Sequence, residues 1–266
     1  MSKLRTAIHG AAGRMGKRLV ALGSADPDLE ITAALEFATH PDVGKDAGTL
    51  AGLGPIGVCL TSALTHDLDV VIDFSIPEAT ESLLAQCVEK KIPLVVATTG
   101  LSAEQKQRLA VAAKTIPLVW SPSMSPAVNL TMKLAALAAQ TLKDCPGGAD
   151  VEIIERHHRF KEDAPSGTAL KFGEIITAIM GQTANRDGRT GQTGKRPHQE
   201  IGYHAVRIGD NPGEHTILFG MLGETIELTV KASNRDCYAI GALQAAKFVA
   251  RQKPGLYNMY DVLNLS

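Results

Sequence analysis

The sequence lacks a long apolar segment and an excess of charge, and each absence excludes a class of protein. No apolar run approaches the roughly 20 residues that span a bilayer, and the N-terminus has no long apolar region of the kind found in secretory signals. A net charge of −1 and only 4 % aromatic residues argue against a nucleic-acid surface, which usually carries a basic excess. We therefore expect a cytoplasmic protein that binds neither nucleic acid nor membrane.

The cysteines are few, and they form neither a Cys-x-x-Cys pair nor a cluster with histidine. This pattern favours reduced, packed thiols over a zinc site or a disulfide framework, so no metal is expected. The four are Cys59, Cys87, Cys145 and Cys237. Hydrophobic residues make up 44 % of the 266 positions, which is enough for one large domain or two ordinary ones.

The first half of the chain alternates short β-branched runs with longer amphipathic stretches, which predicts a parallel sheet covered by helices on both faces. Proline begins the second predicted helix, and Ser102 with Gln105 forms a capping-box pattern before the third. The expected strands are 4–9, 30–35, 56–60, 69–74, 92–97 and 116–120. The expected helices are 14–23, 77–90 and 102–114.

The pattern changes after residue 127. A Gly-, Thr- and Arg-rich stretch at 181–199 is predicted to be a mobile loop, and the strand expected at 224–232 alternates apolar with polar residues, so that one of its faces is buried. The other strands are expected at 151–156, 201–208 and 214–220, and the helices at 128–142, 166–180 and 235–251. This order predicts an α+β domain with an open mixed sheet. We expect two domains, 1–127 joined by the C-terminal helix 236–266, and 128–235.

A glycine-rich segment closes the first strand and opens the first helix. It reads Gly10-Ala11-Ala12-Gly13-Arg14-Met15-Gly16. Glycines in this position allow a tight turn and let backbone N–H groups approach a pyrophosphate. Glu36 ends the second strand at about the expected twenty residues further on, where a carboxylate accepts hydrogen bonds from ribose hydroxyls. Alone the segment is also compatible with an ordinary strand–helix turn, but this context predicts a Rossmann-like dinucleotide domain.

The residue that follows Glu36 bears on the choice of cofactor. A 2′-phosphate beside Glu36 needs a nearby cation, and the next residue is Phe37. We therefore expect NADH to be used at least as well as NADPH, although Arg14 could still reach a phosphate.

Two later strands end in small polar residues at the same edge of the predicted sheet, where ligands bind in open α/β folds. We expect these segments to line the nicotinamide half of the site, although plain turn chemistry also accounts for them. They are Ala97, Thr98, Thr99 and Gly100, and Ser121, Pro122, Ser123, Met124 and Ser125.

The densest concentration of reactive side chains follows the strand expected at 151–156. His157 and His158 are adjacent, Lys161 follows, and Ser166-Gly167-Thr168 begins a helix. A helix start of this kind offers a hydroxyl and free N–H groups to an anion, and histidine suits proton transfer near neutral pH. A solvated basic turn is the alternative, but the combination favours a site for a small polyanionic substrate.

The segment His-His-Arg-Phe-Lys-Glu-Asp-Ala-Pro-Ser-Gly-Thr-Ala closely resembles the active-site signature of the 4-hydroxy-tetrahydrodipicolinate reductase (dihydrodipicolinate reductase) family. The resemblance extends over nearly the whole chain, through residues 10–16, 33–36, 72–75, 98–100, 213–216 and 231–235. It implies NADH- or NADPH-dependent reduction of 4-hydroxy-tetrahydrodipicolinate to tetrahydrodipicolinate with loss of water, in diaminopimelate and lysine biosynthesis.

The resemblance also implies roles for individual residues. His157 would be the general acid/base, and Lys161 a proton donor that assists loss of the ring hydroxyl. The substrate carboxylates would be held by His158, Lys161, Ser166, Gly167 and Thr168. The cofactor would be lined by Gly10, Ala11, Ala12, Gly13, Arg14, Met15, Glu36, Ala97, Thr98, Thr99, Ser121, Pro122, Ser123 and Met124.

The chain departs from the family pattern at a few positions. Ser123 stands where the family usually has Asn, Pro126-Ala127 replaces a Val-Gly pair, and Phe37 replaces an Arg found in members that bind NADPH well. These departures put the detailed contacts and the stiffness of the hinge in doubt, not the reaction.

The sheet predicted in the second half implies self-association, because a sheet covered by helices on one side leaves its other face in need of a partner. The family resemblance implies a homotetramer joined through this region. Two alternatives remain for the function. One is another small two-domain NAD-dependent dehydrogenase of the aspartate or homoserine type, and the other is a non-catalytic NAD-sensing protein. Both have no need for the His157, Lys161 and Ser166 spacing.

Overall fold

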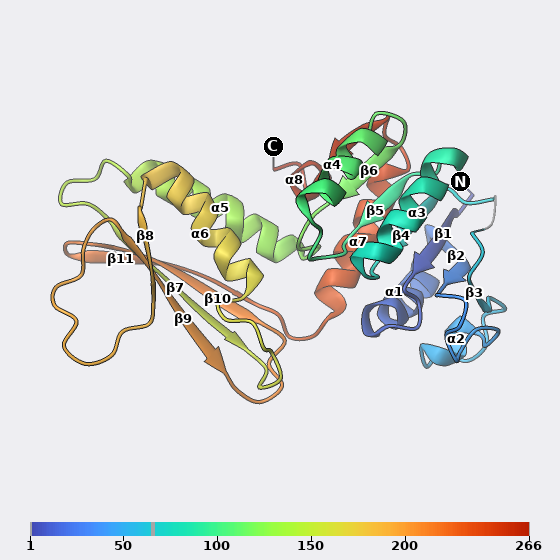
Figure 1. Cartoon of the computed structure of the whole chain (residues 1–266), viewed down its shortest axis with the longest axis horizontal. Helices are drawn as coiled ribbons and strands as arrows, with labels where there is room; N and C mark the ends of the chain where they lie inside the picture. The colour runs from blue at the N-terminus through green and yellow to red at the C-terminus, as the bar shows by residue number, and fades with distance from the viewer. Residues whose placement is uncertain (1, 65–66, 266) are drawn as a thin grey trace. The chain divides into compact units, whose positions relative to one another are not determined.

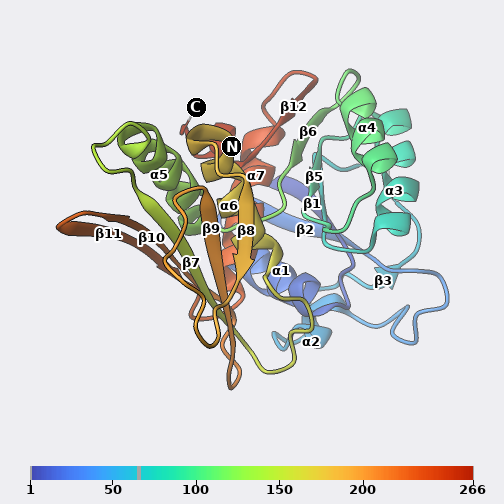
Figure 2. The same cartoon turned by 60° about the vertical axis from the view of Figure 1, so that its left-hand side comes forward.

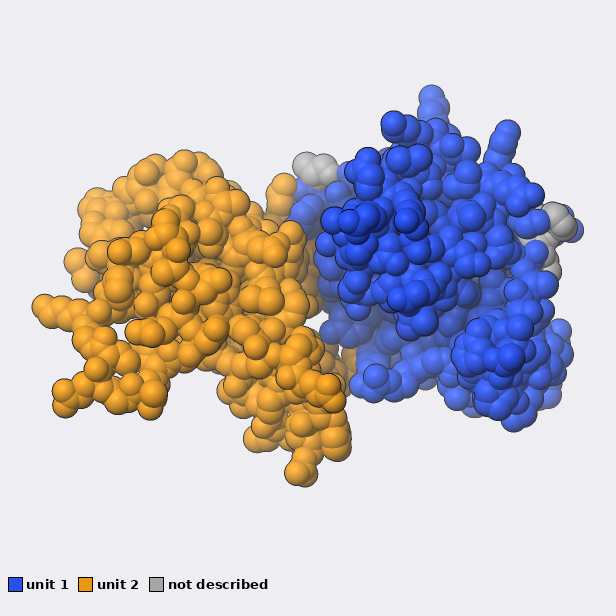
Figure 3. Space-filling model, viewed as in Figure 1, with its two compact units in different colours: residues 1–126, 235–266 blue, residues 127–234 orange. Residues whose placement is uncertain are grey.

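The computed structural model describes residues 2–64 and 67–265 and divides the chain into two compact units (Figure 3). Unit 1 comprises Met1–Pro126 and Arg235–Ser266, and unit 2 comprises Ala127–Asn234. The predicted domain boundaries fall within one residue of these junctions.

Unit 1 is built on a seven-stranded parallel sheet of order β12-β6-β5-β4-β1-β2-β3 (Figures 1 and 2). The order reverses between β1 and β4, and ligands bind at such switch points, outside the carboxyl ends of the strands. The strands are β1 (Leu4–His9), β2 (Leu29–Leu35), β3 (Leu60–Thr61), β4 (Val70–Asp73), β5 (Leu94–Val96), β6 (Pro117–Trp120) and β12 (Gly255–Tyr257).

Helices cover both faces of this sheet because neighbouring residues on each strand point to opposite faces. Ile8 packs in a core with residues of α1 and α7, whereas Ala7 packs in a second core with residues of α3 and α4. The helices are α1 (Arg14–Ala25), α2 (Ala47–Leu50), α3 (Pro77–Lys90), α4 (Ala103–Ala112), α7 (Asp236–Val249) and α8 (Met259–Val262). The predicted Rossmann-like sheet, the proline at the start of α3 and the capping box of α4 are confirmed.

Two expectations for unit 1 are corrected. The strand expected at 56–60 is reduced to the last residue of that range, because Gly54 and Gly57 adopt positive φ and Asp46 accepts hydrogen bonds from the Ile56 and Gly57 amides. The segment 236–266 is not a single helix. It is helical to residue 249 and then adds β12, whose residues pair with 117–119 of β6.

Unit 2 contains a five-stranded mixed sheet of order β11-β10-β7-β9-β8, with α5 and α6 lying over one face (Figures 1 and 2). β10 is antiparallel to β7 and β11, whereas β7, β9 and β8 are parallel. Its elements are α5 (Pro126–Leu142, beginning at the last residue of the preceding part of unit 1), β7 (Asp150–His157), α6 (Gly167–Met180), β8 (Ala184–Asp187), β9 (Glu200–Arg207), β10 (Glu214–Met221) and β11 (Glu224–Lys231). The open mixed sheet with helices on one side is confirmed.

The prediction of a loop at 181–199 is partly wrong. Residues 184–187 form the edge strand β8, and all four are exposed, which explains why no apolar pattern marked them. Within residues 2–64 and 67–265, no helix is long and apolar enough to cross a membrane, and no group of His, Cys, Asp and Glu has the arrangement of a metal site.

Candidate active site

The glycine-rich segment of unit 1 forms a tight turn from β1 into α1. Gly10 has a φ of +77°, and a Cβ placed on it would lie 2.5 Å from the carbonyl oxygen of Phe74. A Cβ on Gly16 would lie 2.1 Å from the carbonyl oxygen of Gly10, so the first turn of α1 packs directly on the loop. Both positions exclude any larger residue, so the turn and the packing of α1 on it depend on these glycines.

A pocket of about 560 Å³ opens beside this turn, a volume typical of ligand sites. The walls come from the ends of β1, β2 and β4 and from α3. Among the residues that line it are His9, Gly10, Gly13, Glu36, Phe37, Phe74 and Ile76. This is the edge at which the sheet order reverses, so the pocket lies where a dinucleotide would be expected.

Glu36 faces the glycine loop, as expected from its spacing. Its Oε1 accepts a hydrogen bond of 3.0 Å from the amide of Ala12. Phe37 is 60 % exposed and stacks edge-on against His40. Arg14 is exposed on the first turn of α1, and Met15 is partly buried there. The residues present therefore fit a dinucleotide whose ribose lies near Glu36.

A buried carboxylate lies at the centre of the same edge. Asp73, at the end of β4, is fully buried and accepts hydrogen bonds from His9 Nδ1 at 2.7 Å and from Thr98 Oγ1 at 2.9 Å. The hydroxyls of Ser75 and Thr80 donate to it as well, each at 2.6 Å. Sequence reasoning assigned no role to Asp73 or His9, although an acid that ends a doubly buried strand is itself an unusual signal.

The residues expected at the ends of β5 and β6 do lie on this edge, but several turn inward. The Thr98 hydroxyl is committed to Asp73, and Ser121 donates to the carbonyl of Ser123 at 2.8 Å. Ala97, Ser121, Ser123 and Met124 are buried, while Thr99 and Pro122 are exposed. Of the residues expected after β5 and β6, Thr99, Gly100 and Pro122 are the exposed ones.

In unit 2, His157 ends β7 and is held by Glu155 on the same strand. Glu155 is 1 % exposed, and its Oε2 lies 2.5 Å from His157 Nδ1. The second oxygen, Oε1, accepts from the Ser166 amide at 3.1 Å. One carboxylate thus joins the predicted acid/base histidine to the start of α6.

Ser166 caps α6 but is fully engaged by the protein. Its Oγ accepts from the Ala169 amide at 3.2 Å and lies 3.1 Å from Nε2 of His215. Burial and the charge of His157 lower the pKa of His215 to about 4, so its imidazole is neutral near pH 7. The serine hydroxyl thus has two partners within the protein, and Gly167 and Thr168 are the next two residues at the helix start.

Lys161 and His158 lie in the loop between β7 and α6. Lys161 Nζ donates to both oxygens of Asp163, at 2.7 and 2.9 Å, and its side chain is 21 % exposed. Within the described chain, the buried Nδ1 of His158 has no hydrogen-bond partner. An unpaired buried nitrogen and a half-buried cation are both suited to an anionic ligand.

Sequence reasoning missed Glu155, Arg207 and His215 as members of this site. Glu155 and His157 are two apart on a strand and so share a face, which was a usable signal. Arg207 and His215 come from β9 and β10, and only the pairing of these strands with β7 brings them close.

Unit 1 has a parallel sheet with a glycine loop and an acid after its second strand. Unit 2 of the same chain carries a histidine–lysine site. Together these features define a two-domain nicotinamide-dinucleotide-dependent oxidoreductase. The family model described as "Dihydrodipicolinate reductase, N-terminus" matches residues 4–124, and that described as "Dihydrodipicolinate reductase, C-terminus" matches residues 127–263. The chain therefore belongs to the dihydrodipicolinate reductase family, and the resemblance inferred from its motifs is confirmed.

Curated relatives agree along the full length. The chain is 59 % identical over 269 residues to the 4-hydroxy-tetrahydrodipicolinate reductase of Rhodopirellula baltica, covering 97 % of this chain and 95 % of the relative. It is 48 % identical to that of Hahella chejuensis, covering 98 % and 99 %. The structure of dipicolinate-bound dihydrodipicolinate reductase from Paenisporosarcina sp. TG-14 superposes with a TM-score of 0.77 at 25 % identity, covering 97 % and 98 %. An amine dehydrogenase from Mycobacterium smegmatis, at 15 % identity and a TM-score of 0.66, shares the fold.

Proposed function

We propose that the protein reduces 4-hydroxy-tetrahydrodipicolinate to tetrahydrodipicolinate, with loss of water, in diaminopimelate and lysine biosynthesis. The names of its relatives support this substrate, and the dipicolinate in the related structure is a small dicarboxylate. The observation that carries the proposal is the buried Glu155–His157 pair beside Lys161 and the start of α6.

The bound dinucleotide would supply the hydride that reaches C4 of the substrate ring. The protein's own residues would handle protons and charge. Lys161 would donate a proton to the leaving ring hydroxyl, so that it departs as water, and His157 would act as the general acid/base. The proposed role of Lys161 would require its ammonium group to leave Asp163 and contact the substrate instead.

Substrate carboxylates would be held by His158, Lys161 and the start of α6. Because the Ser166 hydroxyl and amide are already bonded to His215 and Glu155, we assign direct contacts to Gly167 and Thr168. Ser166 then acts by fixing the end of the helix that meets the anion.

The decisive experiment offers the purified protein freshly synthesised 4-hydroxy-tetrahydrodipicolinate and follows loss of NADH or NADPH absorbance. Turnover with this compound, and none with aspartate or homoserine in the reverse direction, is expected. Turnover only with an amino-acid substrate would indicate the alternative dehydrogenase, and cofactor binding without any turnover would indicate a sensing protein.

For the cofactor we propose that NADH is used at least as well as NADPH. Glu36 lies against the glycine loop and Phe37 follows it, so a 2′-phosphate would meet a carboxylate and no adjacent cation. The contacts would come from Gly10, Ala11, Ala12, Gly13 and Arg14, with Met15 and Glu36, and from the ends of β5 and β6 at Ala97, Thr98, Thr99, Ser121, Pro122, Ser123 and Met124.

We also propose a homotetramer joined through unit 2. The face of the sheet opposite α5 and α6 exposes apolar side chains, among them Ile154 at 39 % and Val206 at 40 %. A face of this kind is typical of an interface between copies. Light scattering would test it, and a mass of one chain, 28.1 kDa, at micromolar concentration would reject it.

A further inference from the structure

Glu155 makes more contacts than a surface strand acid would need. Its two oxygens accept from His157 Nδ1, from the Ser166 amide and from both terminal nitrogens of Arg207, each of the latter at 2.8 Å. Arg207 in turn donates to the carbonyl of Asp163 at 2.6 Å. The carboxylate therefore connects β7, β9, the start of α6 and the loop that carries Lys161.

The charge state of Glu155 determines which nitrogen of His157 carries a proton. Burial raises the pKa of this carboxyl, but the hydrogen bonds from His157 and Arg207 outweigh burial and lower the pKa to about 2. An ionised carboxylate can only accept, so Nδ1 of His157 must hold the hydrogen. Nε2 is then the nitrogen left for proton transfer.

The ring of His157 is confined on its other side by a glycine. A Cβ on Gly213, whose φ is +150°, would lie 2.9 Å from His157 Nε2. His215 packs edge-on against the same ring, with centroids 5.2 Å apart. The imidazole thus has one orientation set by Glu155, Gly213 and His215 together.

We propose that Glu155 is a positioning residue, which fixes the tautomer of His157 and holds it in register with the anion-binding start of α6. This rests on the proposed function, in which His157 transfers a proton. Glu155 itself need not touch the substrate, because it is 1 % exposed and its oxygens are occupied.

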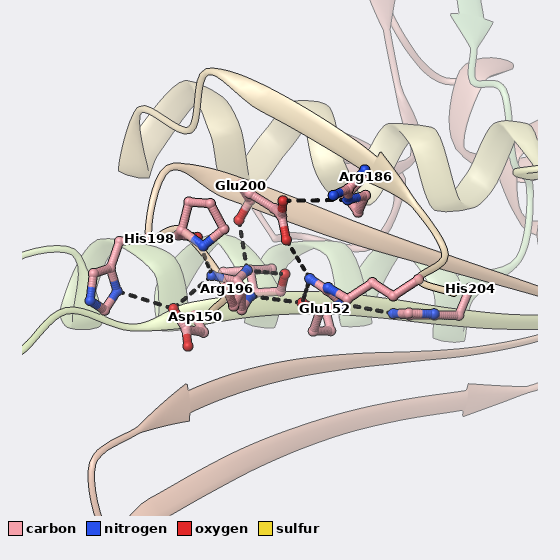
Figure 4. A network of polar contacts seen from close by, with 10 residues as sticks. Asp150, Glu152, Arg186, Arg196, His198, Glu200 and His204 are labelled. Carbon is pink, nitrogen blue, oxygen red and sulfur yellow. Dashed lines mark hydrogen bonds and ion pairs between the residues drawn. The ribbon is translucent and has the colours of Figure 1, made fainter. Parts of the chain in front are cut away.

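A purely structural role is the rival explanation, and unit 2 offers a matched control for it. Glu152 lies on the same strand and binds two arginines and a histidine, as seen with Arg196 and His204 in Figure 4. Burial raises its pKa, but hydrogen bonds from Arg189, Arg196 and His204 lower it to about 2. Among the described hydrogen bonds, Glu152 contacts neither His157 nor α6. It is therefore an ionised, arginine-bound carboxylate like Glu155, but it has no link to the proposed acid/base histidine.

The experiment compares Glu155→Gln, Glu155→Asp and Glu152→Gln in steady-state kinetics over pH. Because the hydrogen bond to a charged group is lost, Glu155→Gln should lose about 10- to 100-fold in kcat, with the KM for NADH unchanged. Removing the negative charge beside Nδ1 should also move the alkaline limb of kcat/KM to lower pH by about one unit. Glu155→Asp keeps the negative charge and should return the alkaline limb of kcat/KM to its wild-type pH. Glu152→Gln should change kcat by less than about twofold.

Other charged groups near the pair are Arg207 of β9, His215 of β10 and Lys161 of the loop. A second measurement is therefore needed to assign the alkaline limb of kcat/KM to His157. The ¹⁵N chemical shifts of the His157 ring report which of its nitrogens is protonated. A larger share of the Nε2–H form is expected in Glu155→Gln, because the amide can present its NH₂ as well as its oxygen to Nδ1. An unchanged tautomer and unchanged limb, or an equal effect of Glu152→Gln, overturns the proposal.

A double-variant comparison separates this proposal from the proposed function. If His157 transfers the proton, adding Glu155→Gln to His157→Asn should lower kcat little further. A His157→Asn enzyme with normal turnover contradicts the proposed function. A His157→Asn enzyme that is impaired while Glu155→Gln is not contradicts only the positioning role.

Discussion

Replacing Asp73 by alanine tests whether the cofactor edge of unit 1 depends on one buried carboxylate. Burial raises the pKa of Asp73, but the hydrogen bond and charge of His9 and the hydroxyls of Ser75 and Thr80 lower it below its usual value, so the group is ionised near neutral pH. The variant leaves His9 and three hydroxyls facing a cavity that no longer accepts their hydrogens.

The expected loss follows from these contacts. Leaving a buried donor without its acceptor costs about 1–3 kcal/mol. Thr80 keeps the Ile76 carbonyl at 3.2 Å and Thr98 Oγ1 at 3.0 Å, so we count His9 and one hydroxyl as left without an acceptor. We therefore expect Asp73→Ala to lower the free energy of unfolding of unit 1 by about 2–6 kcal/mol.

Asp69→Ala is the matched control, because Asp69 pairs with Arg5 at 2.9 Å but is 34 % exposed. An exposed pair contributes about 0–1 kcal/mol, so this variant should be nearly neutral. Amide hydrogen exchange of β4 and β5 measures the loss, with the strands of unit 2 as an internal reference. NADH affinity, read by calorimetry, should fall with Asp73→Ala because His9 lines the pocket and loses its hydrogen-bond partner. Equal effects of the two variants would refute the reasoning.

Three further predictions follow from the sites. Lys161→Ala and His157→Ala should each lose at least about 10²-fold in kcat while NADH affinity stays within about threefold; near-normal turnover, or loss of NADH binding, contradicts their roles. Phe37→Arg should shift kcat/KM toward NADPH, and a wild-type preference for NADPH of about tenfold or more, 1.4 kcal/mol, contradicts the view of Glu36. Burial and the charge of His157 lower the pKa of His215 to about 4 from its usual 6.5, so unit 2 should lose stability as pH falls from 6.5 toward 4. His215→Gln, whose amide oxygen can still accept from Ser166, should flatten that window in urea titrations, and an unchanged slope excludes His215 as its cause.

The sequence predicted the elements whose pattern is local. The proline of α3, the capping box of α4 and the apolar runs of β4 and β5 are properties of short stretches, and the structure has them within a few residues. The exposed strand β8 and the short strand β12 carry no such pattern. They exist because β9 and β6 present edges to which they pair, and this depends on the fold as a whole.

The site was predictable in its reactive residues and not in their supports. His157, Lys161 and Ser166 stand together in one segment, so their proximity could be read directly. The commitment of the Ser166 hydroxyl to His215 could not, because the two are 49 residues apart and meet only through strand pairing. This contact is the basis for the supporting role proposed for Ser166.

Both units place an ionised, buried carboxylate at or near the end of a central strand, and in both it binds Nδ1 of a histidine. Asp73 holds His9 at 2.7 Å, and Glu155 holds His157 at 2.5 Å. Each carboxylate also accepts a hydrogen bond from a residue in a segment expected to contact ligand. The donor is the Thr98 hydroxyl in unit 1 and the Ser166 amide in unit 2. Such a network must form for the unit to fold with its charge satisfied, so the site geometry is already set in the free protein. Substitutions of these two acids should therefore lower both the free energy of unfolding and the activity. Substitutions of Lys161, whose side chain is 21 % exposed, should lower the activity alone.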